Sequence, residues 1–151
     1  MKKVFSMMPL ILAAIVFFNL TTAQATLPNS AFALGGVSPG MSRSDAVGIL
    51  GEPTWSDGDE LKYADGLSVE IKHELVKEIQ AKRGASVATP AGIKVGQQEA
   101  TLNEIYGRAD KVHVEDGGYE VDYTYYSHDG NLKMKFKVKN SVITEIECEL
   151  R

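Results

Sequence analysis

The stretch that decides the fold occurs twice in this chain. Gly36-Val37-Ser38-Pro39-Gly40 is followed by Ala46, Ile49, Leu50 and Gly51. After a constant offset, Gly92-Ile93-Lys94-Val95-Gly96 is followed by Leu102, Ile105, Tyr106 and Gly107. The match runs without a gap from residues 36–51 onto residues 92–107. A repeat of this kind indicates that one supersecondary unit has been used twice.

Each copy of the motif predicts a short helix. In the first copy Ser42 can cap the helix, with Asp45 three residues later, and Ala46, Ile49 and Leu50 fall on one face. Gly51 ends this helix, and Gly107 ends its counterpart. Helices of this length are marginal alone, so we expect both to pack on a sheet. Ile105→Ala should therefore cost about 2–4 kcal/mol by cavity formation.

After each helix the hydrophobic period changes to two, which is typical of strands. In the second copy, residues 119–125, 132–138 and 142–150 alternate between apolar and polar side chains, with turns at 128–131 and 140–141. Shorter counterparts occur in the first copy at 61–63, 67–71 and 75–79. The predicted fold is α+β: a tandem repeat of a short helix plus a three-stranded antiparallel β-meander, with the helices packed on one sheet face. The two sheets either stay separate or join edge to edge.

The first 25 residues have the features of a signal peptide. Lys2 and Lys3 precede an apolar run over residues 4–20, and Ala23-Gln24-Ala25 has the form of a cleavage site. Ala31-Phe32-Ala33 is a second candidate site, and an uncleaved anchor is the alternative, since the apolar run is near the minimum for a membrane span. We expect export to the periplasm or the extracellular space, with no membrane span after cleavage.

The remaining chain divides at a short uncharged segment. Residues 26–34 are predicted to be a disordered lead-in, 35–83 the first repeat, 84–91 a linker rich in small residues, and 92–151 the second repeat.

Net charge and cysteine content argue against several kinds of partner and anchor. Loss of Lys2 and Lys3 with the leader takes the formal net charge from −4 to −6, which argues against nucleic acid and anionic membranes. Cys148 is the single cysteine, so the chain has no intramolecular disulfide and no cysteine at either cleavage site for a lipid anchor. The simplest interpretation of Cys148 is a small buried strand residue; a free thiol or an intermolecular bridge is the alternative.

The motif G-[IV]-x-x-G-x-x-x-x-x-[AL]-x-x-[IL]-[LY]-G, followed by strands and then repeated, resembles the beta-lactamase-inhibitor-protein-like superfamily. Pro39-Gly40-Met41-Ser42 with Gly51 and Pro53 is similar to a single unit of the SmpA/OmlA-type outer-membrane-assembly lipoproteins. The second copy looks like uncharacterised secreted bacterial proteins of the same fold. The resemblance covers residues 35–151 and implies a binding role rather than a particular chemistry.

Motifs for catalysis are incomplete. His73-Glu74-Leu75-Val76-Lys77 begins like a zinc-protease helix, but Lys77 stands where the second histidine is required. Gly36-Val37-Ser38-Pro39-Gly40 has the letters of a nucleophile elbow but lacks the buried strand before the serine. We therefore predict no catalytic, cofactor-binding or metal-binding residue, no cofactor and no enzyme activity.

Aromatic and charged residues offer two further signals. The aromatic residues in or next to the first predicted strand of each repeat are candidates for a protein interface: Trp55, Tyr63, Tyr119, Tyr123, Tyr125 and Tyr126. For Tyr119, Tyr123 and Tyr125 the alternative is a place on the core face with Val121, so Trp55 and Tyr126 are the better candidates for an exposed contact. An interface predicts that Trp55, Tyr63 and Tyr126 share one exposed patch. Lysines 133, 135 and 137 should form cross-strand ion pairs with glutamates 145, 147 and 149.

These observations together predict a secreted or periplasmic, non-enzymatic module that binds a protein or peptide of unknown identity. The alternatives are a scaffold in outer-membrane or cell-wall assembly, and an inhibitor of a secreted hydrolase.

Overall fold

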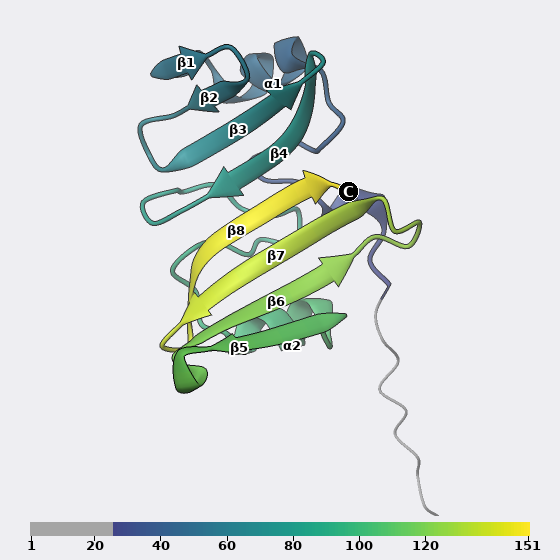
Figure 1. Ribbon diagram of the computed structural model, residues 1–151, viewed down its shortest axis with the longest axis vertical. Coiled ribbons are helices and arrows are strands. Elements are labelled where there is room, and N and C mark those ends of the chain that lie inside the picture. Colours follow the sequence, from purple (N-terminus) through teal and green to yellow (C-terminus); the bar gives the residue numbers. More distant parts are fainter. Residues whose placement is uncertain (1–25) are drawn as a thin grey trace, which may run out of the picture.

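The computed structural model describes residues 26–151, apart from the side chain of Asp116. The predicted signal peptide, residues 1–25, lies outside this range. The described residues form one sheet of eight strands in the order β1-β2-β3-β4-β8-β7-β6-β5, and every neighbouring pair is antiparallel (Figure 1). No helix within residues 26–151 is long and apolar enough to span a membrane.

The two repeats contribute equally to this sheet. The elements of the first are α1 (Arg43–Leu50), β1 (Trp55–Asp57), β2 (Glu60–Lys62), β3 (Leu67–Lys72) and β4 (Leu75–Ala81). The elements of the second are α2 (Ala100–Tyr106), β5 (Lys111–Glu115), β6 (Glu120–Tyr126), β7 (Leu132–Lys139) and β8 (Val142–Leu150). Two short 3₁₀ turns, η1 (Asn29–Ala31) and η2 (Asp116–Gly118), lie outside this pattern.

The predicted fold class is wrong in its basic unit. Each repeat supplies four strands instead of three, and a single large sheet with two short helices replaces the helix-plus-meander pair. The strands that the prediction missed, β1 and β5, form the two edges of the sheet, and all their residues are exposed. β1 has three residues and is too short to show a hydrophobic period, whereas β5 does alternate, with Val112 and Val114 between polar residues, and could have been recognised from that pattern.

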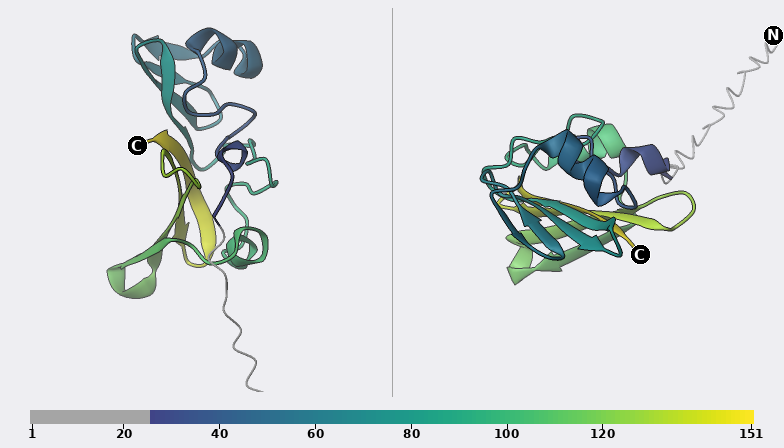
Figure 2. Two further views of the ribbon diagram at one scale, coloured as in Figure 1. Left: turned by 90° about the vertical axis from the view of Figure 1, so that its right-hand side faces the viewer. Right: turned by 90° about the horizontal axis from the view of Figure 1, so that it is seen from above.

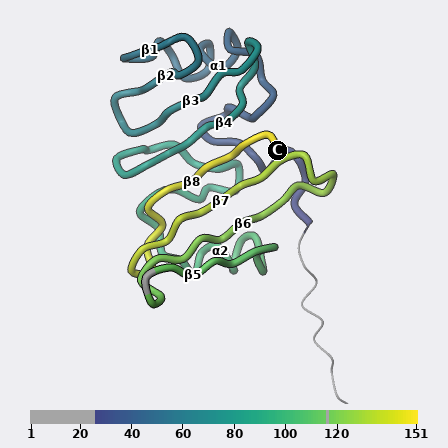
Figure 3. Tube along the Cα trace, in the orientation of Figure 1, coloured from purple at the N-terminus to yellow at the C-terminus, as the bar shows by residue number. Residues whose placement is uncertain are grey.

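The two repeats meet through their last strands. β4 pairs with β8, with Gln80 directly opposite Glu147, Ile79 opposite Cys148 and Ala81 opposite Ile146. In the last strands of the two repeats, residues 75–79 correspond in sequence to residues 142–146, so Gln80 is the equivalent of Glu147. Because these two equivalent residues lie opposite one another, a pseudo-two-fold axis passes between them. The backbone trace shows the two halves related across β4 and β8 (Figure 3).

Backbone details recur in both halves. The turns before β4 and β8 hold non-glycine residues at positive φ, His73 and Glu74 in one and Asn140 and Ser141 in the other. The segment before each helix bonds to the last strand of its own repeat: Gly40 N–H donates to the carbonyl of Val76, and Gly96 N–H to that of Ile143, both at 2.7 Å. These contacts fix each helix relative to the sheet.

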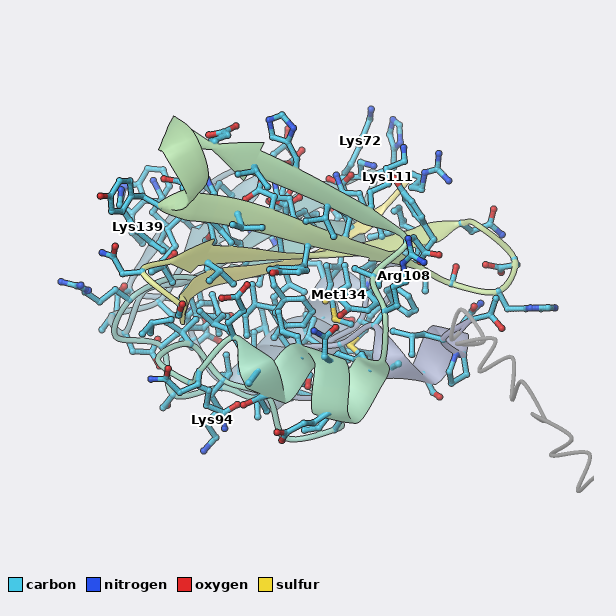
Figure 4. The ribbon with its side chains drawn as sticks, turned by 90° about the horizontal axis from the view of Figure 1, so that it is seen from below. Lys72, Lys94, Arg108, Lys111, Met134 and Lys139 are labelled. Atoms are coloured by element: carbon cyan, nitrogen blue, oxygen red, sulfur yellow. The ribbon has the colours of Figure 1, made fainter. Side chains whose placement is uncertain are left out.

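Both helices cover the same face of the sheet, and we call the other face the open face (Figure 2). Met134 lies between the sheet and α2, whereas Lys72 and Lys111 project from the open face (Figure 4). The core between sheet and helices is continuous across both repeats, as expected when one face of an antiparallel sheet is solvated. Its largest fully buried side chains include Tyr125, Phe32, Phe136, Leu34, Leu61 and Ile79.

The predicted helix stripe is only partly buried. Ser42 caps α1 as expected, its Oγ accepting from the backbone N–H of Asp45 at 3.1 Å. Ala46 and its counterpart Leu102 are buried. Ile49 and its counterpart Ile105, three residues further along each helix, are 50% and 45% exposed. The isoleucine of each helix therefore lies at the edge of the contact between helix and sheet, and the predicted cost of about 2–4 kcal/mol for Ile105→Ala is too large.

The lead-in over residues 26–34 is packed instead of disordered. Phe32 and Leu34 are fully buried, and Leu27 is 8% exposed. The backbone of Leu27 accepts a hydrogen bond from His128 N–H at 3.0 Å, which ties this segment to the second repeat. Cleavage after Ala33 would remove Phe32 from the core, whereas cleavage after Ala25 would retain it.

Candidate functional site: the open face of the sheet

Three of the six candidate aromatic residues hold the helices in place. Tyr125 is fully buried and its hydroxyl donates to the carbonyl of Gly107 at 3.2 Å. Tyr63 makes the equivalent bond to Gly51, also at 3.2 Å. Both glycines follow a helix, so each tyrosine anchors a helix C-terminus to the sheet. These residues serve the fold.

Tyr123 also faces the helices. Its hydroxyl donates to a carboxylate oxygen of Glu99, at the start of α2. Burial, and then the hydrogen bond and charge of Glu99, raise the pKa of Tyr123 to about 12. Burial also raises the pKa of Tyr125, followed by the influence of Tyr123. Both hydroxyls are therefore protonated donors at neutral pH.

The other three candidates are accessible but do not form one patch. Tyr119, 68% exposed, lies between η2 and β6. Trp55 and Tyr126 both lie on the open face, but in β1 and β6, about 29 Å apart across the sheet. Tyr63 faces the helices, because it lies two residues after the buried Leu61. The predicted single patch of Trp55, Tyr63 and Tyr126 is therefore wrong.

A cation lies over each aromatic ring of the open face. Lys62 Nζ is 4.5 Å from the centroid of the Trp55 ring and 3.2 Å from Oε2 of Glu60. Arg151 and Lys111 lie over Tyr126, at 4.6 Å and 5.4 Å from the ring centroid. The Trp55 ring, 45% exposed, is thus in a setting that favours positive charge.

A row of carboxylates crosses the open face in direct register. Asp57 of β1 pairs with Glu60 of β2, Glu60 with Glu70 of β3, Glu70 with Glu78 of β4, and Glu78 with Glu149 of β8. We call these five residues the acidic row. On β7 the row ends at Lys133, which pairs with Glu149.

Like charges directly opposite one another on neighbouring strands are destabilising. The effect on a single residue is clearest at Glu78, whose pKa is raised to about 7. Burial is the first cause, and the charges of Glu147, Glu149 and Glu70 follow. The raised pKa shows that both the burial of this carboxyl group and the negative charges around it disfavour its ionised form.

The carboxylates of Glu78, Glu147 and Glu149 have oxygens within 4.8 Å of one another, a spacing that could suit a metal ion. Glu147, however, already pairs with Lys133 at 3.6 Å and Lys135 at 3.3 Å. The group is therefore better described as the point where the acidic row meets the lysines of β7 than as an open set of ligands.

Most of the acidic row borders a shallow hollow of about 300 Å³ on the open face, over β1–β4. Its lining is polar and mostly acidic: Asp57, Asp59, Glu60, Ser68, Glu70, Glu78 and Gln80. On the β7–β8 side, by contrast, lysines and glutamates neutralise one another, which confirms the predicted ladder for Lys133 and Lys135. Lys137 instead forms an ion pair with Glu120, with 3.8 Å between Nζ and Oε1.

Sequence reasoning missed the acidic row, although each of its residues was visible. Asp57, Glu60, Glu70 and Glu78 lie in four strands, and only the register between the strands places them side by side. The prediction that Cys148 is a small buried strand residue is confirmed: it is fully buried, and burial raises the pKa of its thiol.

Comparison with known proteins supports the fold alone. No family model and no curated protein matches this chain. A solved structure of a DUF4309 family protein, YjgB from Bacillus subtilis subsp. subtilis strain 168, is similar with a TM-score of 0.53. The two sequences are 15% identical, and the similarity covers 84% of this chain and 88% of the other. At this level of identity the match concerns architecture and carries no function.

Proposed function

We propose that this chain is an exported, non-enzymatic binding module that docks a positively charged segment of a protein partner on the acidic row. The supporting observation is the direct register of five carboxylates across five strands, on the face that the helices leave uncovered. Export rests on the predicted leader, and the absence of catalytic motifs in the sequence favours binding over chemistry.

The dimensions of the acidic row suit an extended segment. From β1 to β8 the row crosses four inter-strand steps, or about 19 Å. This is the length of about six residues of extended chain, and far longer than the coordination sphere of one ion. A partner with several lysines or arginines could therefore meet the carboxylates in series.

Trp55 adds a second recognition element at one end of the row. Its ring already accommodates the ammonium of Lys62, which is held at the same time by Glu60. A lysine or arginine of the partner could use the same combination of an aromatic face and a carboxylate. The exposed indole would supply the apolar contact that a purely acidic surface lacks.

The acidic row lowers the stability of the free protein in favour of binding. Without a partner, the opposed carboxylates repel one another and lower the stability of the sheet. A cationic partner removes that repulsion on binding, so the stability of the sheet is lowered only while the protein is free. Surfaces that reduce stability in this way are typical of functional sites.

Site-specific photo-crosslinking in the organism that makes this chain tests the proposal. A photoreactive residue at Ser68, in the hollow beside the acidic row, should give discrete adducts with a protein partner. The matched control is a photoreactive residue at Glu104, exposed on α2 on the other side of the sheet. Neutralising Glu70 and Glu78 by glutamine should abolish the adducts from position 68.

Adducts that form equally from positions 68 and 104, or that survive neutralisation of both glutamates, would show that the acidic row does not select the partner. Absence of any adduct from position 68 would count against docking on this face.

A further inference from the structure

β5 is an edge strand whose outer side has no neighbour within residues 26–151. It ends the strand order and pairs only with β6. All five of its residues are exposed, including Val112 at 53% and Val114 at 57%. The opposite edge, β1, has three residues, a length that limits pairing with another chain. β5 is thus the less protected edge of the sheet.

The sequence of β5 is complementary to itself when reversed. Lys111-Val112-His113-Val114-Glu115 has a positive charge at one end, a negative charge at the other and a valine on each side of the central histidine. If two copies pair antiparallel with His113 opposite His113, each Lys111 lies opposite a Glu115 and each Val112 opposite a Val114. Residues opposite one another in an antiparallel pair share a face of the sheet.

The faces of β5 are consistent with this pairing. Lys111 and His113 pair with Thr124 and Asp122 of β6 and so lie on the open face, as does Glu115. Val112 and Val114 alternate with them and lie on the helix face. Two copies would therefore form two Lys–Glu pairs on the open face and one cluster of four valines on the other.

We propose that a second copy of this chain pairs with β5, with a two-fold axis through His113, so that one continuous sheet runs through both molecules. The charge complementarity of β5 with itself identifies the occupant. The contact has the geometry of the internal β4–β8 junction, where equivalent strands of the two repeats already pair about a pseudo-two-fold axis. A two-fold contact of this kind closes on itself and gives a dimer.

The size of the contact sets the expected affinity. Five residues per copy bury less surface than the roughly 1,200 Å² typical of stable complexes, so we expect a dissociation constant in the micromolar to millimolar range. The acidic row begins at the opposite edge of each sheet and stays uncovered. The dimer would therefore carry two separate docking surfaces. The inference does not depend on the function proposed above.

Sedimentation velocity over about 10 μM to 1 mM, on the protein in the form that the cell accumulates, tests the dimer. Lys111→Glu places two glutamates opposite one another at both ends, and Glu115→Lys does the same with two lysines. Each single variant should weaken dimerisation about tenfold or more. The double variant K111E/E115K restores opposite charges and should dimerise like the wild type, and a mixture of the two single variants should form heterodimers.

Lys94→Glu and Glu104→Lys are matched controls, since they change the net charge identically at exposed positions away from β5. Thermal unfolding of every variant verifies that the fold is retained. A chain that stays monomeric up to 1 mM would overturn the proposal. A dimer that is unaffected by the single variants, or not restored by the charge swap, would place the interface elsewhere and would equally overturn it.

Discussion

Replacing Glu78 by glutamine should stabilise this protein at alkaline pH and leave its stability at acidic pH unchanged. Glu78 faces Glu70 on one side and Glu149 on the other, and its pKa is raised to about 7 by burial and by these charges together with that of Glu147. Glutamine keeps the shape and polarity of the protonated side chain but cannot ionise.

The sign follows from the proton balance. The ordinary pKa of a glutamate, which the unfolded chain retains, is 4.5, whereas the pKa of Glu78 in the folded protein is about 7. Between these values the folded state binds more protons than the unfolded state, so its stability falls as the pH rises. The loss of stability is complete above the pKa of Glu78 in the folded protein and absent below the pKa of a glutamate in the unfolded chain.

The magnitude follows from the shift. A rise of about 2.5 pKa units corresponds to about 3.4 kcal/mol if none of the interaction is screened. Glu78 is only partly buried, and solvent screening reduces this to roughly 1–2 kcal/mol. Glu78→Gln should therefore raise the free energy of unfolding by roughly 1–2 kcal/mol at pH 8 and change it little at pH 4.

Urea unfolding of both proteins at pH 4, 6 and 8 measures this difference directly. Glu104→Gln, at an exposed site on α2, is the control and should show no such pH dependence. A stability difference between Glu78→Gln and wild type that is the same at pH 4 and pH 8 would refute the reasoning. So would a loss of stability at pH 8, because it would mean that the charged carboxylate makes a favourable contact.

Three further predictions concern the fold and can be checked by the same unfolding experiment. Leu102→Ala should cost about 2–4 kcal/mol, whereas Ile105→Ala should cost less than about 1 kcal/mol because the isoleucine is half exposed; equal costs would contradict the observed orientation of α2. Tyr125→Phe should cost about 1 kcal/mol by removing the hydrogen bond to Gly107, and a neutral result would mean that this bond does not anchor the helix. Phe32→Ala should cost about 3–5 kcal/mol, and a cost near zero would restore the idea of a disordered lead-in.

Much of the molecule was accessible from the sequence because it depends on local patterns. The glycines at 51 and 107 end helices, and the strands that bury one face, such as β7, show the alternation from which they were predicted. Of the two edge strands that were missed, β1 is too short to show this alternation, whereas β5 shows it in Val112 and Val114 and was recognisable in principle. The packing of Phe32 escaped because a single apolar residue in an irregular segment has no period.

The candidate site was largely inaccessible for a different reason. The aromatic pattern predicted an interface role for Tyr63, Tyr123 and Tyr125, but these side chains face the helices and form hydrogen bonds at the helix ends. The acidic row depends on register: Glu78 meets Glu149 only because β4 pairs with β8 at one particular alignment. Pairing between strands from different repeats is a long-range property that the order of residues does not display.

The most direct test of docking on the acidic row is a titration with an octalysine peptide at pH 8 and low salt, monitored by the fluorescence of Trp55. This residue is the single tryptophan of the chain and lies next to Asp57 of the acidic row. We predict saturable binding that the double variant Glu70→Gln/Glu78→Gln weakens about tenfold or more, although the same variant unfolds less easily. The control Glu52→Gln/Glu104→Gln, with the same change in charge at exposed sites outside the row, should bind like the wild type. Equal affinity for all three proteins would contradict docking on the acidic row.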